Sequence, residues 1–277
     1  MTGHVGVRLL ACDVDGTLIT TGARLSEETR KALLDLRALG IEVVLATGRS
    51  PWGIRDLCED LGLLGPQITM QGALVVSPLS GAIMKAYTMS ASRVSEQVEF
   101  ARSLGLDCVV CSPFEYRLQQ LTPGLASPVP RRFLERGHIR EVASIAELAG
   151  DGALRTFVFT PEGLHQTARA AVEREFGSRF SITWGDEDAV EILAHGVSKG
   201  SALVALASHL GIDMAEVAAI GDGRNDLEML AAAGRSAAMA WAPSEVRAAA
   251  SLVVGDGALE ALRHFFPRLA HLARGTI

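Results

Sequence analysis

Two aspartates separated by one residue follow an apolar segment near the N-terminus. The segment covers residues 5–12 with a single polar break, and Asp13 and Asp15 come directly after it. A nearly continuous apolar run of this length predicts a strand that is buried on both faces. Chemistry in open α/β sheets takes place just beyond the carboxyl ends of such strands. We therefore expect the two carboxylates to lie side by side at a sheet edge, with Gly16 permitting a tight turn after them.

Carboxylates held this close repel each other, and each disfavours ionisation of the other. The pair is reasonable if a cation lies between Asp13 and Asp15, or if one of them carries a proton during a reaction. A simpler interpretation is that an aspartate only caps the turn after the strand. The pair alone leaves these alternatives open, so the rest of the chain must decide between them.

Predicted helices and strands alternate through the first part of the chain. A helix over residues 26–40 is indicated by Ser26 as its N-cap and by apolar residues at helical spacing. A strand over residues 41–46, a helix over residues 51–61 and a strand over residues 67–70 follow. This β-α-β-α-β order is typical of a parallel sheet covered by helices.

The same pattern returns in the last third of the chain, after a segment of different character. A helix begins after its cap at Ser198, and an apolar strand covers residues 217–220. The middle segment predicts a hairpin, two helices and three short strands, over residues 72–82, 92–104, 162–176, 108–111, 154–160 and 180–184. We therefore predict an α/β core formed by residues 1–82 and 193–277, with an inserted α/β domain over residues 83–192.

Polar side chains follow three of the predicted core strands at the points where these strands end. They belong to Asp13 and Asp15, then Thr47-Gly48, then Asp222, Asn225 and Asp226. If the strands are neighbours in one sheet, four carboxylates share one crevice, which requires a compensating cation. Ligation by carboxylate and amide oxygens suits a hard ion such as Mg²⁺.

Lys199 is a second indication of an anion-binding site. It is one of only three lysines in the chain, and it stands in the first turn of a predicted helix. A cation there faces the positive end of the helix dipole, which is unfavourable. A lysine that swings into solvent is the simpler interpretation, but we favour a fixed anion beyond the helix N-terminus, which Lys199 neutralises.

These groups together are typical of a phosphoryl-transfer site, which needs in-line positioning, a metal ion and donors around the phosphoryl oxygens. We expect Asp13 to be the nucleophile that forms an aspartyl-phosphate, and Asp15 to be the general acid and base. Thr47 and the backbone amide of Gly48 would bind phosphoryl oxygens, and Lys199 would offset their charge.

The expected Mg²⁺ ligands are the carboxylates of Asp13 and Asp222 and the backbone carbonyl of Asp15. Asn225 and Asp226 would support the ion, either directly or through its other ligands. The residues expected to contact the substrate are Thr47, Gly48, Lys199, Asn225 and Gln71.

The order of these motifs resembles the haloacid dehalogenase (HAD) superfamily. The matching residues are Asp13-x-Asp15-Gly16-Thr17, Thr47-Gly48-Arg49, Lys199 and Gly221-Asp222-x-x-Asn225-Asp226. Each motif is weak alone, but the ordered set is specific and covers both halves of the predicted core. Within the superfamily the chain looks like the Cof-type phosphatases of subfamily IIB, whose insert also lies between the Thr-Gly-Arg motif and the lysine.

The resemblance implies a Rossmann-like parallel sheet with an inserted α/β cap of the C2B type. It also implies Mg²⁺-dependent hydrolysis of small phosphomonoesters, often sugar phosphates. Two residues depart from the family pattern, because Gln71 and Trp241 each stand where members commonly have asparagine. We expect Gln71 near the leaving group, where it can change substrate preference, and we interpret Trp241 as a packing change. Residues 115–117 of the insert are expected to form an exposed loop.

The composition excludes some classes of binding partner and indicates where in the cell the protein acts. A net charge of −6 and a pI near 5.7 argue against a nucleic-acid or anionic-membrane partner. No apolar window is long enough for a membrane span, and no basic-then-apolar leader begins the chain, so we expect a cytoplasmic protein with a small-molecule substrate. The four cysteines, including the C-x-x-C pair Cys108 and Cys111, are interpreted as buried thiols.

Three other functions fit parts of the pattern. A sugar phosphomutase or another phosphotransferase would use the same site with a sugar hydroxyl as acceptor. A binding protein that kept the fold and lost turnover is disfavoured by the intact set Asp13, Asp15, Lys199 and Asp222. A receiver-like signalling domain would be smaller, and it would lack both the insert and the acid-base group at Asp15.

Overall fold

The computed structural model describes residues 6–20, 24–119, 138–160, 163–183 and 189–269. The chain divides into two compact units. The core unit consists of residues 1–84 and 198–277, and the inserted unit consists of residues 85–197. Each unit has its own sheet and its own buried apolar residues. Val5, Glu162 and Trp184, at the ends of predicted elements, lie outside the described residues.

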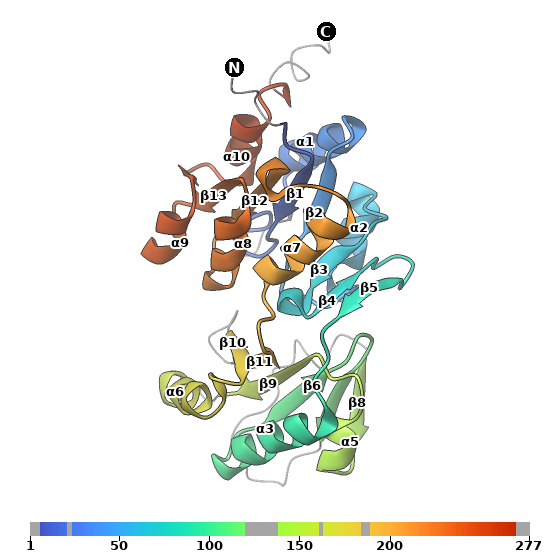
Figure 1. Ribbon diagram of the computed structural model, residues 1–277, viewed down its shortest axis with the longest axis vertical. Coiled ribbons are helices and arrows are strands. Elements are labelled where there is room, and N and C mark those ends of the chain that lie inside the picture. The colour runs from blue at the N-terminus through green and yellow to red at the C-terminus, as the bar shows by residue number, and fades with distance from the viewer. Residues whose placement is uncertain (1–5, 21–23, 120–137, 161–162, 184–188, 270–277) are drawn as a thin grey trace. The chain divides into compact units, whose positions relative to one another are not determined.

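The core unit is built on a five-stranded parallel sheet that joins the two ends of the chain. The strand order is β14 (Leu252–Val254), β13 (Arg235–Met239), β12 (Val217–Gly221), β1 (Leu9–Cys12) and β2 (Glu42–Leu45). Figure 1 shows the blue β1 and β2 beside the orange β12. Cys12 is level with Ile220 on one neighbour and with Leu45 on the other. The chain therefore leaves these three strands at the same edge of the sheet.

Strand β1 is buried on both faces, as its apolar run predicts. Leu10 and Cys12 belong to one apolar cluster, whereas Leu9 and Ala11 belong to another. The first cluster includes residues of α1 (Glu27–Ala38), α2 (Arg55–Leu61) and α10 (Ala258–Phe265). The second includes residues of α7 (Lys199–His209), α8 (Leu227–Ala232) and α9 (Ser244–Ala249). Helices thus cover both faces, which confirms the predicted α/β class.

A small three-stranded sheet follows β2 and ends in the predicted hairpin. It has the order β3 (Gln67–Thr69), β4 (Leu74–Val76) and β5 (Ile83–Ala86). A single parallel bridge between Ala46 and Ile68 joins it to the end of β2. A 3₁₀ turn, η2 (Met70–Gly72), separates β3 from β4, so the first strand of the hairpin begins at Leu74 rather than at residue 72.

The inserted unit is a mixed sheet with helices on one face. Its order is β10 (Phe180–Thr183), β11 (Ala189–Ala194), β9 (Arg155–Phe159), β6 (Cys108–Cys111), β7 (Tyr116–Gln119) and β8 (Ile139–Val142). Among the strand pairs that the structure describes in this unit, only the pairing of β7 with β8 is parallel. One apolar cluster includes residues of α3 (Ala91–Ser103), α5 (Ile145–Ala149) and α6 (His165–Phe176). The insert is therefore α/β, as predicted.

The prediction of an exposed loop at residues 115–117 is wrong. Tyr116 and Arg117 begin β7, and both are buried. The guanidinium of Arg117 donates to Glu115 Oε1 at 2.9 Å and to the carbonyl of Asp151 at 2.7 Å. The local sequence does not indicate that residues 115–117 are buried. Their partners, strand β8 and the carbonyl of Asp151, come roughly 20 or more residues later in the chain.

All four cysteines are buried free thiols, as their sequence context predicts. Cys108 and Cys111 lie in β6 and form no disulfide with each other. In the part of the chain that the structure describes, no helix has the length and apolar character needed to cross a membrane.

Candidate active site

Three carboxylates from two neighbouring strands meet at one edge of the core sheet. Asp13 follows β1, whereas Asp222 and Asp226 follow β12. Asp13 is tied to the end of β12 because its backbone N–H donates to the carbonyl of Ile220 at 2.9 Å. One oxygen of each carboxylate lies within 4.8 Å of an oxygen of the other two. We call Asp13, Asp222 and Asp226 the carboxylate cluster.

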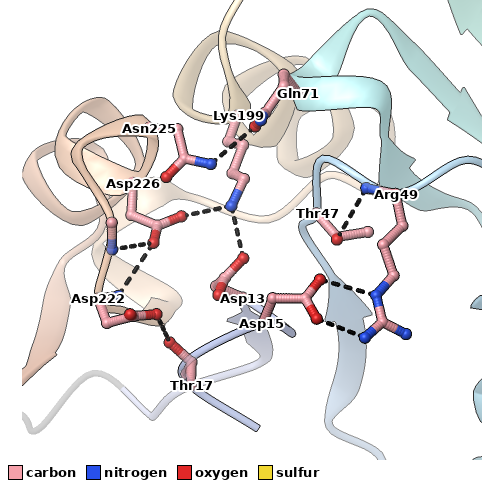
Figure 2. A network of polar contacts seen from close by, with 11 residues as sticks. Asp13, Asp15, Thr17, Thr47, Arg49, Gln71, Lys199, Asp222, Asn225 and Asp226 are labelled. Carbon is pink, nitrogen blue, oxygen red and sulfur yellow. Dashed lines mark hydrogen bonds and ion pairs between the residues drawn. The ribbon is translucent and has the colours of Figure 1, made fainter. Parts of the chain in front are cut away.

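Lys199 supplies a positive charge inside the carboxylate cluster. It is the first residue of α7, whose N-cap Ser198 accepts from the backbone of Ser201. Its Nζ lies 2.6 Å from Oδ1 of Asp13 and 2.7 Å from Oδ1 of Asp226 (Figure 2). The side chain is only 1% exposed. The anions beyond this helix N-terminus therefore include two carboxylates of the protein itself.

Burial and mutual repulsion control the ionisation of these groups. Burial lowers the pKa of Lys199, but Asp13 and Asp226 outweigh this effect, so the pKa is raised above its usual value. Burial raises the pKa of Asp13; Lys199 opposes this rise, and Asp226 and Asp222 add to it. Burial also raises the pKa of Asp222. The raised pKa keeps Lys199 protonated. The raised pKa values of Asp13 and Asp222 show that its single charge does not fully stabilise the ionised carboxylates.

The carboxylate cluster fits a small divalent cation. Three carboxylates face one ammonium group, which leaves two negative charges in excess when all are ionised. The donor atoms are all oxygen, which suits a hard ion such as Mg²⁺. Asp13 and Asp222 come from the ends of adjacent strands, so the sheet itself sets their separation.

Asp226 also fixes the backbone of the loop that carries Asp222. Its Oδ2 accepts from the backbone N–H groups of Asp222 at 3.0 Å and Gly223 at 2.9 Å. Its other oxygen binds Lys199, and the side chain is fully buried. Asp226 therefore links α7 to this loop, which orients Asp222.

The Asp15 side chain points away from the carboxylate cluster and toward Arg49 (Figure 2). Nε of Arg49 donates to Oδ2 of Asp15 at 2.7 Å, and a second guanidinium nitrogen donates to Oδ1. This contact raises the pKa of Arg49 above its usual value. The Asp15 side chain is 58% exposed, so it can exchange partners with a ligand. Sequence reasoning missed Arg49 as a functional residue, although it directly follows Thr47-Gly48.

The turn after β2 is held against η2 by backbone contacts. The carbonyl of Thr47 accepts from the N–H of Gln71 at 3.1 Å, and its hydroxyl accepts from the N–H of Arg49 at 3.1 Å. A Cβ at Gly48 would lie 2.6 Å from Nε2 of Gln71, so any larger residue there would displace the Gln71 side chain. The predicted substrate residues Thr47, Gly48 and Gln71 are therefore brought together.

Gln71 joins this turn to the loop after β12. Its Oε1 accepts from Nδ2 of Asn225 at 2.9 Å. Its backbone has φ 60° and ψ 25°, a left-handed conformation that is uncommon outside glycine and costs of order 1 kcal/mol. This strained conformation places the Gln71 amide between Gly48 and Asn225. The structure thus brings Asn225 to Gln71.

Thr17 is a further site residue that sequence reasoning mentioned only as part of a motif. Its hydroxyl donates to Oδ1 of Asp222 at 2.7 Å. This bond lowers the pKa of Asp222, although burial raises it more strongly. The sequence signal for this role of Thr17 is its place in the Asp-x-Asp-Gly-Thr motif, four residues after Asp13.

Nearly the whole chain is similar to a family of known proteins. The family model of haloacid dehalogenase-like hydrolases matches residues 10–266. The chain is 29% identical to pyridoxal phosphate phosphatase YbhA of Escherichia coli, covering 93% of this chain and 97% of the relative. It is 30% identical to the HMP-PP phosphatase of Cronobacter sakazakii, covering 93% of this chain and 94% of the relative.

The fold is also that of solved structures. The HAD subclass IIB sugar phosphatase BT4131 superposes with a TM-score of 0.78 over 94% of this chain and 99% of its own, at 24% identity. The family match spans both parts of the core unit and the insert between them. The chain therefore belongs to the haloacid dehalogenase-like hydrolases, and its fold is that of their Cof-type subfamily IIB.

Proposed function

We propose that this chain is a Mg²⁺-dependent phosphatase that hydrolyses phosphate monoesters of small metabolites through an aspartyl-phosphate on Asp13. The observation that carries the proposal is the meeting of Asp13 with Lys199 in a buried cluster of three carboxylates. Such a cluster is costly to build unless a cation completes it. Its relatives include phosphatases of pyridoxal phosphate and of HMP-PP.

The first step is attack by a carboxylate oxygen of Asp13 on phosphorus. A bond forms between this oxygen and phosphorus, and the bond from phosphorus to the ester oxygen breaks. Asp15 donates a proton to the leaving oxygen, which departs as an alcohol. For this donation Asp15 must exchange its contact with Arg49 for one with the substrate, which its exposed position permits.

The second step is hydrolysis of the aspartyl-phosphate. Asp15, now a carboxylate, takes a proton from water while the water oxygen attacks phosphorus. The bond between phosphorus and Asp13 breaks, which regenerates the carboxylate and releases inorganic phosphate. The proton given up in the first step is thereby recovered.

We expect three donors to balance the charge on the phosphoryl oxygens, namely the ammonium group of Lys199, the hydroxyl of Thr47 and the backbone N–H of Gly48. Asp13, Asp222 and the carbonyl of Asp15 would hold Mg²⁺, and Asn225 and Asp226 would support it. When bound, the ion would spread the negative charge of the phosphoryl group.

Sugar phosphates are the substrate class that we propose to test first, because the resemblance to Cof-type phosphatases implies it. A panel of phosphorylated metabolites should also contain pyridoxal phosphate and HMP-PP, on which named relatives act. Release of inorganic phosphate with Mg²⁺ present is the measurement. We expect hydrolysis of at least one member of the panel by the wild-type chain and none by Asp13→Asn.

Asp35→Asn is a matched control, because Asp35 lies on α1 and pairs with the exposed Lys31. This variant should keep full activity. Phosphate release that survives Asp13→Asn would contradict the proposal. Transfer of phosphate to a second sugar, without release of free phosphate, would favour a phosphotransferase instead.

A further inference from the structure

Trp241 contacts the loop that carries Asp13 and Asp15. It lies in the segment after β13, and its side chain is 49% exposed. Among the described residues, the two apolar clusters of the core unit do not include it. Its indole Nε1 donates to the carbonyl of Gly16 at 3.1 Å, across 225 positions of the sequence. The contact is therefore polar and specific, which the interpretation of Trp241 as a packing change did not anticipate.

Gly16 lies against the carboxylate cluster. Its φ is +88°, and a Cβ at this position would overlap the carboxylate of Asp222. Its N–H donates to the carbonyl of Ile19 at 2.8 Å, so one side of the residue is fixed by the local turn. Glycine has no side chain to hold its own peptide group in place. The indole of Trp241 fixes the other side by binding the carbonyl.

The next residue extends this arrangement to the proposed metal ligand. Thr17 follows Gly16, and its hydroxyl donates to Asp222 at 2.7 Å. Two neighbouring residues are thus held by two different segments. The carbonyl of Gly16 is bound by the segment after β13, and the side-chain hydroxyl of Thr17 is bound by the loop after β12. Asp15, whose own carbonyl is an expected Mg²⁺ ligand, directly precedes Gly16.

We infer that Trp241 is a positioning residue for the cation site, acting through its hydrogen bond to the carbonyl of Gly16. The bond holds the segment from Asp15 to Thr17 at a fixed distance from Asp222, so that donors on both loops can reach one ion. This inference rests on the proposed function, because it requires that a divalent cation binds the carboxylate cluster. Trp241 then contributes to the affinity for the cation through its indole N–H and not through its ring surface.

Two variants separate the hydrogen bond from packing. Trp241→Phe keeps an aromatic ring and removes the donor, whereas Trp241→Gln removes the ring and keeps an N–H donor of similar reach. We expect Trp241→Phe to weaken Mg²⁺ binding about fivefold, the effect of one net hydrogen bond. Trp241→Gln should bind Mg²⁺ more tightly than Trp241→Phe. Val253→Ala is the matched control, because Val253 is an apolar residue of adjacent β14 with similar exposure.

The measurement is isothermal titration calorimetry of the full chain with Mg²⁺, together with thermal melting in EDTA. Trp241→Phe should leave the melting temperature in EDTA unchanged, because the ring is half exposed. Equal Mg²⁺ affinity of wild type and Trp241→Phe would overturn the inference. So would equal weakening in the Phe and Gln variants, because an N–H donor at this position would then make no difference to Mg²⁺ affinity. A wild-type chain that binds no Mg²⁺ would instead refute the cation site itself, and the inference with it.

Discussion

The ammonium group of Lys199 lies 2.6 Å from Oδ1 of Asp13, and both side chains are almost completely buried. The two residues are 186 positions apart, and the inserted unit separates them in the sequence. A buried ion pair contributes little net stability over an apolar pair, because desolvation opposes the attraction. Breaking one is costly, however, since the remaining charge is left uncompensated.

Replacement of Lys199 tests this relationship. Lys199→Met should lower the free energy of unfolding by about 3 to 5 kcal/mol, because Asp13 and Asp226 lose their partner. It should also lower kcat/KM by roughly a hundredfold to a thousandfold, since a preorganised charge is removed. Lys31→Met is the control, because Lys31 is an exposed lysine of α1. Chemical denaturation and steady-state kinetics are the measurements, and wild-type kinetics in Lys199→Met would contradict the role of Lys199.

Removal of divalent cations should silence the enzyme reversibly. We expect EDTA to abolish phosphate release and Mg²⁺ to restore it, because the single charge of Lys199 does not balance the three carboxylates of the cluster. Mg²⁺ at a hundred times its Kd should also stabilise the fold by about 2.7 kcal/mol, visible as a higher melting temperature.

Asp222→Asn should reduce the Mg²⁺-dependent rise in melting temperature. Asp60→Asn, at an exposed position of α2, should leave it unchanged. Activity that is indifferent to EDTA would refute the metal assignment.

The contact between Gln71 and Asn225 predicts a coupled pair. Gln71→Leu and Asn225→Ala should each lower kcat/KM by roughly fivefold, because each removes the hydrogen bond that joins the two loops. The double variant should lose little more than either single variant, since the same bond cannot be lost twice. Steady-state kinetics on one substrate for all four proteins gives this cycle. Strictly additive losses would show that the two residues act independently.

The inserted unit contains a buried carboxyl that should make its stability depend on pH. Both oxygens of Asp107 are buried without a hydrogen-bond partner among the described residues, and burial raises its pKa to about 6. The unfolded chain releases this proton near pH 4, whereas the folded chain keeps it until about pH 6. The folded state therefore loses relative stability as pH rises from about 4 to about 6, by on the order of 2 to 3 kcal/mol.

Asp107→Asn should remove this loss. The free energy of unfolding of the variant, relative to wild type, should therefore be higher at about pH 7 than at about pH 4.5, two values on either side of the window. Asp151→Asn, at an exposed position of the same unit, should follow the wild-type curve. Thermal melting at both pH values is sufficient. An Asp107→Asn variant whose stability difference from wild type is the same at both pH values would contradict this prediction.

Local sequence patterns were sufficient to predict the core strands and the polar groups at their ends. The nearly continuous apolar run before Asp13 favours a strand covered on both sides, and β1 is such a strand. The structure pairs β1 with β12 in parallel, which is the condition on which the prediction of a shared crevice depended. Lys199 could be placed in the first turn of its helix because Ser198 is a clear N-cap.

Contacts that depend on tertiary structure could not be predicted in this way. The pairing of Arg49 with Asp15 depends on how the turn after β2 faces the loop after β1, which no local pattern specifies. Trp241 carries no polar pattern either, so the sequence indicates only a packing change there and not its hydrogen bond to Gly16. The burial of Arg117 likewise depends on the backbone of Asp151, in another segment of the inserted unit.

The most direct test of the account is detection of a covalent phosphoryl group on Asp13. The Asp15→Asn variant should slow both steps, because its amide can neither protonate the leaving oxygen nor take a proton from water, and the intermediate that does form should persist long enough to be detected. After brief reaction with a substrate from the panel and acid quenching, peptide mass spectrometry should find one added phosphoryl group on the segment that contains Asp13. Phosphate release by the wild-type chain with no label on Asp13, or with the label on another residue, would contradict the account.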